Sequence, residues 1–297
     1  GAAIGDMMGA TTEFMKEEEI KQKYGEITYP IGGGWLNLNP GEVTDDTQMS
    51  MCVLKSVSEN ISGIQKNMIR QICKEFINWK KSNPKDIGGT CNRVISNFEF
   101  FENQKLSKWS IDDWFNYAKD DTALGNGSLM RCLPTALFCN TSASIMQGML
   151  THNNSLCITS NILYDKLIKD ILMQRYHKMS KNYDEFLDKA FNEIIKSNIS
   201  FIVTDKKAKD GFLSKDIGKE ILDPTGHVVN SLNNAIYFFN KTLSYRTCIK
   251  EIVNMGGDAD TIACIAGGLS GCYYGYFDIP KSWIDVLDVD TRLEIDY

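Results

Sequence analysis

Two stripes of small residues, each with glycine or alanine at every fourth position, constrain the fold of this 297-residue chain most strongly. They are Gly1, Gly5 and Gly9 at one end and Ala263, Gly267, Gly271 and Gly275 near the other. Glycine inside a helix costs up to about 1 kcal/mol relative to alanine, so the stripes need a structural reason. Small residues spaced by four let two helix axes approach closely. We therefore predict that the first and the penultimate helices pack together at the centre, which brings the two ends of the chain together.

Helical periodicity dominates the rest of the sequence. Apolar residues recur at every fourth position from Ile64 to Phe76, and another apolar stripe covers residues 183–194. This spacing is typical of helices that bury one face. Core, partner surface and adenine contact are all open for the aromatic-rich segment 97–114, and we predict the core.

Strand signals are few. Short extended segments are predicted only at residues 27–31 and 201–204, which is too little for a sheet-based core. Glycine and proline turns separate the helical segments, and no stretch has the composition of an interdomain linker. Residues 204–219 form the predicted mobile surface segment. We therefore predict an all-α fold that forms a single domain over residues 1–297.

Charge and histidine content exclude several classes of protein. The formal net charge is -6 and the pI about 5.2, so no basic face is expected to bind nucleic acid. Only three histidines are present, which argues against a histidine-rich zinc site. The least polar run, residues 261–277, is interrupted by glycines and falls short of the roughly 20 apolar residues that a bilayer requires. We predict a buried helix there and no membrane span.

The nine cysteines are scattered, mostly between apolar neighbours, and never form a CxxC pair. They are typical of reduced core residues in an intracellular protein, so we predict a cytoplasmic location. A monomer is a separate expectation. The chain begins at Gly1 without a methionine, and a short native N-terminus with any targeting signal is expected to be missing.

Hydroxyl and carboxylate groups are crowded at two places in the chain. The clusters are Thr44-Asp45-Asp46 and Asp258-Ala259-Asp260-Thr261, each preceded by a glycine-containing turn. Consecutive helical residues point about 100° apart, so such neighbours converge only at a turn or at the first residues of a helix. Because an apolar helical pattern follows each cluster, we predict that both lie at helix N-termini.

Two interpretations of these clusters are open. Helix capping explains one Asp or Thr at each N-terminus, where carboxylates also complement the helix dipole. A cap needs only one oxygen, however, and carboxylates that meet without cations repel one another and raise one another's pKa. An all-oxygen ligand set suits Mg²⁺ or Mn²⁺, and two clusters indicate two ions. Glu13 is a further candidate oxygen ligand on a neighbouring element.

Five segments together resemble the ADP-ribosylglycohydrolase family, most nearly its dinitrogenase-reductase-activating branch. They are GAAIGDMMGATTE, GGGWLNLNPGEVTDDTQMS, LGNGSLMR, THNNS and GGDADTIACIAGGLSGCYYG, in the order of the family, from residue 1 to residue 275. The resemblance implies an all-α orthogonal helical bundle around a central binuclear Mg²⁺ or Mn²⁺ centre. It also implies hydrolysis of the glycosidic bond that joins ADP-ribose to a modified protein side chain, so that the partner is an ADP-ribosylated protein or ADP-ribose.

The same resemblance implies a role for each matched residue. Glu13 matches the loop glutamate assigned to metal binding or to activation of the attacking water, and His152 matches a substrate-contacting histidine. Residues that match the metal ligands are Thr44, Asp45, Asp46, Asp258, Asp260 and Thr261. Residues that match the loop for diphosphate and ribose are Gly125, Asn126, Gly127 and Ser128. Glycines beside a helix start expose backbone N–H groups, as a diphosphate requires, although a plain turn explains this loop as well.

Two departures from the activating branch concern the leaving group. Residues 86–90 read Asp-Ile-Gly-Gly-Thr, which keeps the branch's aspartate as Asp86 but has Gly89 in place of its asparagine. His227 stands where that branch has an aromatic residue. Asp86 is our candidate for positioning a leaving guanidinium, with an exposed loop acid as the alternative.

Three functions are compared. In the first, ADP-ribosyl-arginine is hydrolysed, and Glu13 or Asp45 takes the proton of the attacking water. The second is a non-catalytic, crystallin-like ADP-ribose-binding protein, whose mark would be lost metal ligands. The third is two-metal phosphoester hydrolysis, which requires a basic residue beside the metals; Arg131 is the nearest one carried by a matched segment.

Overall fold

The computed structural model describes residues 1–60, 65–103, 110–175, 189–190, 192, 212 and 222–296. Helices make up most of these residues, with isolated β-bridges but no strand among them, so the all-α prediction is confirmed. The first helices are α1 (Ala2–Gly9), α2 (Glu17–Tyr24), α3 (Asp45–Glu59), α4 (Gln65–Lys81), α5 (Gly89–Asn103), α6 (Ile111–Tyr117), α7 (Leu133–Phe138), α8 (Thr141–Met149) and α9 (Ser155–Leu172). The later helices are α12 (Val228–Lys241), α13 (Tyr245–Met255), α14 (Ala259–Tyr274), the 3-10 turn η2 (Tyr276–Asp278), α15 (Lys281–Ile284) and α16 (Val289–Asp296).

The predicted strand at residues 27–31 is wrong, and several other predicted segments lie outside the described residues. Residues 27–31 are irregular and form no strand. Residues 201–204, nearly all of the predicted mobile segment 204–219 and most of the apolar stripe at 183–194 lie outside the described residues.

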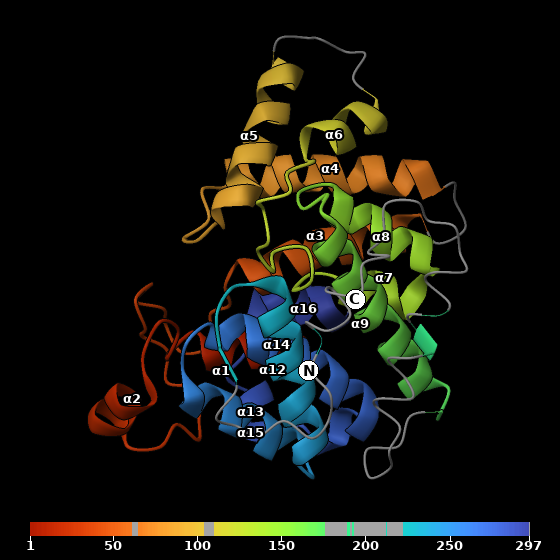
Figure 1. The fold of residues 1–297 in the computed structure, drawn as a ribbon. Helices are drawn as coiled ribbons and strands as arrows, with labels where there is room; N and C mark the ends of the chain where they lie inside the picture. Colours follow the sequence, from red (N-terminus) through yellow and green to blue (C-terminus); the bar gives the residue numbers. More distant parts are fainter. Residues whose placement is uncertain are drawn as a thin grey trace.

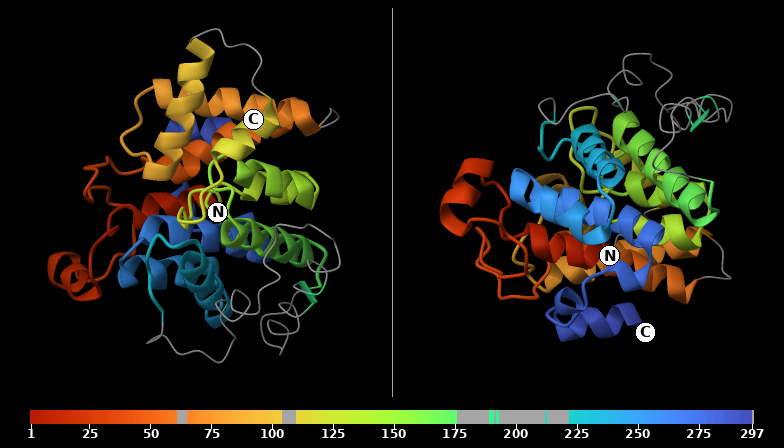
Figure 2. Two further views of the ribbon diagram at one scale, coloured as in Figure 1. Left: turned by 45° about the horizontal axis from the view of Figure 1, so that its top comes forward. Right: turned by 90° about the horizontal axis from the view of Figure 1, so that it is seen from below.

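Helices α1 and α14 pack side by side at the centre of the fold (Figures 1 and 2), as the two stripes predict. A Cβ added at Gly5 would overlap the carbonyl oxygen of Ala263, and one at Gly267 would lie 2.6 Å from the carbonyl oxygen of Gly1. Only glycine permits this approach. The prediction that the second stripe marks the penultimate helix is wrong, because η2, α15 and α16 follow α14. These elements are too short to show a helical period.

Two hydrophobic clusters surround this pair. One combines α1 and α14 with α9, α12 and α13, and the other joins α3, α4, α5 and α6 in the upper part of Figure 1. Phe76 of the predicted stripe on α4 is fully buried in the second cluster, where Phe98 stacks on Trp114 with ring centroids 3.6 Å apart. The core assignment of residues 97–114 is therefore confirmed for these two rings. The single-domain organisation stays a prediction.

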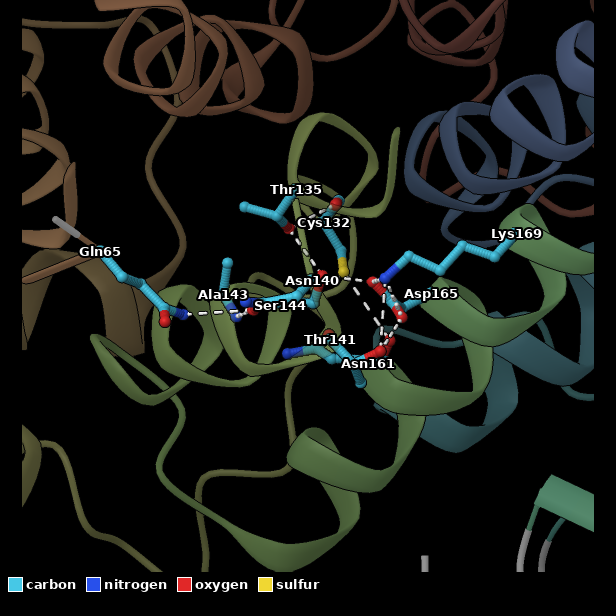
Figure 3. Close-up of polar contacts among 10 residues, drawn as sticks. All are labelled: Gln65, Cys132, Thr135, Asn140, Thr141, Ala143, Ser144, Asn161, Asp165 and Lys169. Carbon is cyan, nitrogen blue, oxygen red and sulfur yellow. Dashed lines mark hydrogen bonds and ion pairs between the residues drawn. The ribbon is translucent and has the colours of Figure 1, made fainter. Parts of the chain in front are cut away.

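A buried polar network joins α7, α8 and α9 (Figure 3). Its centre is Asp165, whose carboxylate accepts hydrogen bonds from Thr141 Oγ1 and Ser144 Oγ, both at 2.7 Å. Lys169, one helical turn later, forms an ion pair with Asp165 at 2.8 Å. The charge of Asp165 is thus balanced within the protein.

Two further predictions concern the cysteines and the apolar helix α14. All nine cysteines are free thiols, buried or half-buried. Within the described part of the chain, no helix combines the length and apolar character needed to cross a membrane.

Candidate metal centre

The two acidic clusters lie at helix N-termini, as predicted. Thr44 caps α3 and accepts a hydrogen bond from the backbone N–H of Asp46, while Asp258 precedes the first residue of α14. The two clusters meet in space, although Asp46 and Thr261 are 215 positions apart in the sequence. Thr261 Oγ1 donates a hydrogen bond to Asp46 Oδ2 at 3.2 Å. The dipoles of both helices therefore direct their positive ends at the same group of carboxylates.

Asp6 holds this arrangement together and was missed by the sequence analysis. It is fully buried in α1 and accepts hydrogen bonds from the hydroxyls of Thr44 at 2.8 Å and Thr47 at 2.5 Å. The backbone N–H groups of both threonines donate to it as well. Asp6 thus fixes the start of α3 against α1. The available signal was a lone carboxylate in the otherwise apolar segment of residues 1–10.

Glu13 comes next to the second cluster through the loop that follows α1. One ligand oxygen each of Glu13, Asp258 and Asp260 lie within 4.8 Å of one another, and all three residues are buried. The backbone of this loop is tied to the turn before α14, since Phe14 N–H donates to Gly257 O at 2.7 Å and Gly257 N–H donates to Met15 O at 2.9 Å. The loop glutamate and the second cluster therefore form one site.

Burial and mutual repulsion dominate the electrostatics of this site. Burial raises the pKa of Glu13 to about 8, that of Asp45 to about 7 and that of Asp258 to about 6. The pKa values of Asp46 and Asp260 lie well above their ordinary range, first because of burial and then because of the neighbouring carboxylates. No Lys, Arg or His among the described residues forms an ion pair with these five groups.

The residues present fit a divalent cation. Asp46 Oδ1 is buried and has no hydrogen-bond partner among the described residues, which leaves a full acceptor at the site. An unsatisfied buried carboxylate oxygen is costly unless a cation binds it. The donor set consists of carboxylate and hydroxyl oxygens, which hard ions such as Mg²⁺ and Mn²⁺ prefer. Helix capping explains only one oxygen side chain at the start of each helix and leaves the others without a reason.

Asp86 lies at the edge of the site, on the α3 side. It is half-buried, and its charge is the largest electrostatic influence, after burial, that raises the pKa of Asp45. The backbone N–H of Gly88 donates to Asp45 Oδ2 at 3.3 Å, so the turn that carries Asp86 is attached to the first cluster. A Cβ on Gly89 would meet nothing within 4 Å, and this position is open.

The loop of residues 125–128 contacts the site through Asn126, whose Nδ2 donates to Asp258 Oδ2 at 2.5 Å. The expected helix start is wrong, because an irregular turn follows the loop and α7 begins only at Leu133. Ser128 is buried, and its Oγ accepts a hydrogen bond from Asn161. The N–H groups of Gly127 and Ser128 donate to no acceptor among the described residues.

His152 lies directly behind this loop. A Cβ on Gly127 would approach its ring to 3.0 Å, and Nδ1 of His152 is 2.8 Å from Thr151 Oγ1. Burial, together with Arg131 and Arg93, lowers the pKa of His152 to about 3, so the ring is neutral. His227 pairs with Gly125 in an isolated bridge and caps α12 through Nδ1.

Arg131, the basic residue that a phosphoester hydrolase would need, is engaged elsewhere. It is fully buried and donates to Gly127 O at 2.7 Å, to Thr151 Oγ1 at 2.8 Å and to Gln147 Oε1 at 3.1 Å. These contacts hold the loop and the histidine segment in place. The donors of this guanidinium are therefore already engaged and do not serve a transferring phosphoryl group.

Comparisons with known proteins agree with this geometry. A family model described as ADP-ribosylglycohydrolase matches residues 1–296. The ADP-ribosyl-[dinitrogen reductase] glycohydrolase of Rhodospirillum rubrum is 31% identical over 301 residues, which cover 99% of this chain and 90% of that protein. The ADP-ribosylarginine hydrolase Tri1 of Serratia proteamaculans is 26% identical over 99% of this chain and 75% of its own length.

A solved structure of an ADP-ribosylglycohydrolase-related protein complex has a TM-score of 0.73 to this chain. It covers 99% of this chain and 92% of its own, at 23% identity, and bears on the fold alone. The match of the family model over nearly the whole length, with a relative above 30% identity, shows that this chain belongs to the ADP-ribosylglycohydrolase family.

Proposed function

We propose that this chain is a divalent-metal-dependent hydrolase that removes ADP-ribose from modified arginine side chains of proteins. Family membership supports the cleavage of a glycosidic bond, and the name of the Serratia relative, an ADP-ribosylarginine hydrolase, supports arginine as the modified residue. The single observation that carries the proposal is the buried meeting of two acidic clusters with Asp46 Oδ1 left unpartnered.

Two ions, Mg²⁺ or Mn²⁺, would be held by the clusters at the starts of α3 and α14. The proposed ligands are Thr44, Asp45, Asp46, Asp258, Asp260 and Thr261. A bound ion supplies Lewis acidity, which lowers the pKa of an attacking water and orients ribose hydroxyls. Two ions also offset the repulsion among carboxylates that raises their pKa values.

Glu13 takes the proton from the attacking water, and Asp45 is the second candidate. A general base works best when its pKa lies near the operating pH, and burial raises the pKa of Glu13 to about 8. Hydrolysis builds positive charge at the ribose carbon. The surrounding carboxylates stabilise this charge, because no cation of the described chain pairs with them.

The loop of Gly125, Asn126, Gly127 and Ser128 binds the diphosphate and ribose. Its contribution comes from backbone N–H groups, since the Ser128 side chain is directed to Asn161. His152 is the neutral support behind Gly127 and contacts the substrate from there. Asn126 links the loop to the metal centre through Asp258.

Asp86 positions the leaving guanidinium. It is half-buried beside Asp45, where its carboxylate faces the acidic site and no lysine or arginine of the described chain pairs with it. A guanidinium presents several N–H donors in a plane that matches a carboxylate. An arginine leaving group therefore suits this edge better than the hydroxyl of serine.

We propose further that the protein is cytoplasmic and monomeric and that it acts on ADP-ribosylated proteins. Its net charge of -6 disfavours nucleic acid as a direct partner.

The non-catalytic alternative predicts degraded metal ligands, whereas every matched ligand position retains an oxygen side chain. The phosphoester alternative requires a free basic residue, whereas the donors of Arg131 are occupied. Neither alternative is favoured.

Peptides that carry ADP-ribose on arginine or on serine, together with a simple phosphoester, test the proposal in parallel with each metal. We expect release of ADP-ribose from the arginine peptide in Mg²⁺ or Mn²⁺ and none in excess chelator. Release from serine alone would refute the arginine assignment. Phosphoester cleavage alone would refute glycosidic hydrolysis, and binding of ADP-ribose without turnover would favour the non-catalytic alternative.

A further inference from the structure

We propose that Trp35 is a positioning residue that fixes the carboxylate of Glu13 through its indole N–H. This inference rests on the proposed role of Glu13 and adds a second residue to it. Trp35 Nε1 lies 2.5 Å from Glu13 Oε2, which is a short hydrogen bond to a carboxylate. The indole N–H is a donor only, so it orients that oxygen and does not take up its proton.

Trp35 differs from the other tryptophans that the structure describes. Trp79, Trp114 and Trp283 are at most 9% exposed, and their N–H groups donate to neutral acceptors, namely Gln48 Oε1, Leu150 O and Thr28 O. Trp35 is 52% exposed and donates to an acid of the metal centre. A tryptophan that mainly serves packing would be buried. The placement of Trp35 therefore indicates a role at Glu13.

The backbone around Glu13 is already immobilised on both sides. Thr12 Oγ1 donates to Val253 O at 2.6 Å, and Phe14 N–H donates to Gly257 O at 2.7 Å. Phe14 adopts a φ of 61°, an unfavourable conformation that these contacts maintain. The remaining freedom of Glu13 lies in its side-chain torsions, and the indole contact restricts them.

The turn that carries Trp35 is attached to the segment that carries Glu13. Thr11 Oγ1 donates to Gly32 O at 3.0 Å, and a Cβ on Gly34 would overlap the carbonyl oxygen of Ala10. Reciprocal backbone hydrogen bonds between Gly33 and Leu38, at 2.7 and 2.9 Å, close the turn. The indole donor and its acceptor thus belong to one rigid unit at the end of α1.

The contact engages one of the two oxygens of Glu13, Oε2. With Oε2 held by the indole, Glu13 keeps one orientation toward Asp258 and Asp260, with which it shares the site. Misplacement of a reacting group by about 1 Å can cost roughly 100-fold in rate. Loss of the indole donor should therefore reduce turnover more than it reduces substrate binding.

The test is a double-mutant cycle of Trp35→Phe and Glu13→Gln, assayed with the ADP-ribosyl-arginine peptide. We expect Trp35→Phe to lower kcat roughly 10- to 100-fold, with KM within about twofold of its original value. In the Glu13→Gln background the same change should have no further effect, because residues that act as a unit are not additive. Trp35→Gln, which restores a side-chain N–H donor, should recover part of the loss.

Trp283→Phe is the matched control, because it removes an indole donor whose acceptor is a backbone carbonyl remote from the acids. It should lower the melting temperature and leave kcat unchanged. Unchanged kcat in Trp35→Phe, or an equal loss in both Glu13 backgrounds, would overturn the proposal.

A readout without turnover separates this inference from the proposed function. Titration with Mn²⁺ alone should change the tryptophan fluorescence of the original protein and of Trp283→Phe, and the change should be absent in Trp35→Phe. If the original protein hydrolyses no ADP-ribosyl substrate, the proposed function fails. The titration then still tests whether Trp35 is coupled to the site. A Mn²⁺-induced change that persists in Trp35→Phe would overturn the coupling between Trp35 and the site.

Discussion

Buried carboxylates occur in two regions of this molecule under opposite conditions. In the network of α7, α8 and α9, Asp165 is fully buried but has Lys169 at 2.8 Å and two hydroxyl donors (Figure 3). At the starts of α3 and α14, several carboxylates meet without a cation from the described residues, and Asp46 Oδ1 has no hydrogen-bond partner among those residues. The described residues balance the charge of the first region, whereas they supply no cation to the second.

We infer that the difference separates a structural acid from acids that serve binding or catalysis. A buried charge that is paired and hydrogen-bonded contributes to a unique packing. Removal of one member of the pair leaves the other as an uncompensated charge in the low-dielectric interior. A buried charge without a partner is destabilising and persists where it serves binding or catalysis. Substitutions in the two regions should therefore have opposite effects on stability and on activity.

Asp46→Asn should have the largest effect on activity. Loss of this proposed ligand should reduce hydrolysis by roughly 1,000-fold or more, since metal-ion catalysis supplies several kcal/mol and each 1.36 kcal/mol is tenfold in rate. In metal-free buffer the same protein should melt at a temperature equal to or above that of the original, because one source of repulsion is removed. Rate assays and thermal melts measure the two effects. A lower melting temperature in metal-free buffer together with full activity would show that Asp46 is a structural acid, contrary to this prediction.

Lys169→Met should show the opposite pattern. It leaves Asp165 buried without its cation, which costs about 3 kcal/mol of unfolding free energy. The rate per folded molecule should stay unchanged, because the network lies outside the acidic site. Urea unfolding and rate assays check both statements. Thr141→Val, which removes one hydroxyl donor to the same carboxylate, should cost only about 1 kcal/mol.

The stability of the metal-free protein should decrease as the pH rises. The pKa values of Asp258, Asp45 and Glu13 are raised to about 6, about 7 and about 8. Such groups bind protons more tightly in the folded state than in the unfolded state, so folding is favoured at low pH, and this contribution is lost between about pH 4 and pH 8. We expect a lower melting temperature at pH 8 than at pH 5.5 in chelator.

Added Mg²⁺ or Mn²⁺ should remove or reverse this dependence, because an ion binds the deprotonated site and stabilises the folded state by about 2.7 kcal/mol at 100 times its dissociation constant. Asp45→Asn should flatten the metal-free profile. A melting temperature that rises with pH in chelator would contradict the assignment of these carboxyls as unpaired acids.

Asn126→Ala should have the smallest effect among the changes at the acidic site. The amide of Asn126 is the donor that links the loop of residues 125–128 to Asp258 Oδ2. Such outer contacts to metal ligands typically contribute 10- to 100-fold, so we expect about a tenfold loss of metal affinity. Calorimetric titration with Mn²⁺ measures it. Asn126→Gln, which keeps a side-chain amide donor, should lose less; equal affinity for Mn²⁺ in all three proteins would exclude the link.

Much of the fold could be predicted from local sequence. The stripe on α4 and the glycine spacing of α1 and α14 follow from helical geometry, in which every third or fourth side chain shares a face. The short elements after α14 could not be predicted, because four to eight residues are too few to show a period. For the loop of residues 125–128 the sequence allows both a helix start and a plain turn, since glycines accompany both, and the structure has the turn.

The candidate site was predictable where its residues are adjacent in the sequence. Thr44 with Asp45 and Asp46, and Asp258 with Asp260, are recognisable as surplus oxygens at helix N-termini. The contacts of Asp6 with Thr47 and of Trp35 with Glu13 join residues 41 and 22 positions apart. No pattern within one segment indicates such pairs.

The amino-acid order alone was enough to specify helices, close glycine packing and two acidic helix starts, because these depend on backbone geometry and on side chains within a few residues. Which acids meet, which hydroxyls serve Asp6 and which oxygen of Asp46 is left without a donor were decided by the tertiary structure. Those outcomes depend on how distant segments pack against α1, where a shift of one ångström makes or breaks a hydrogen bond.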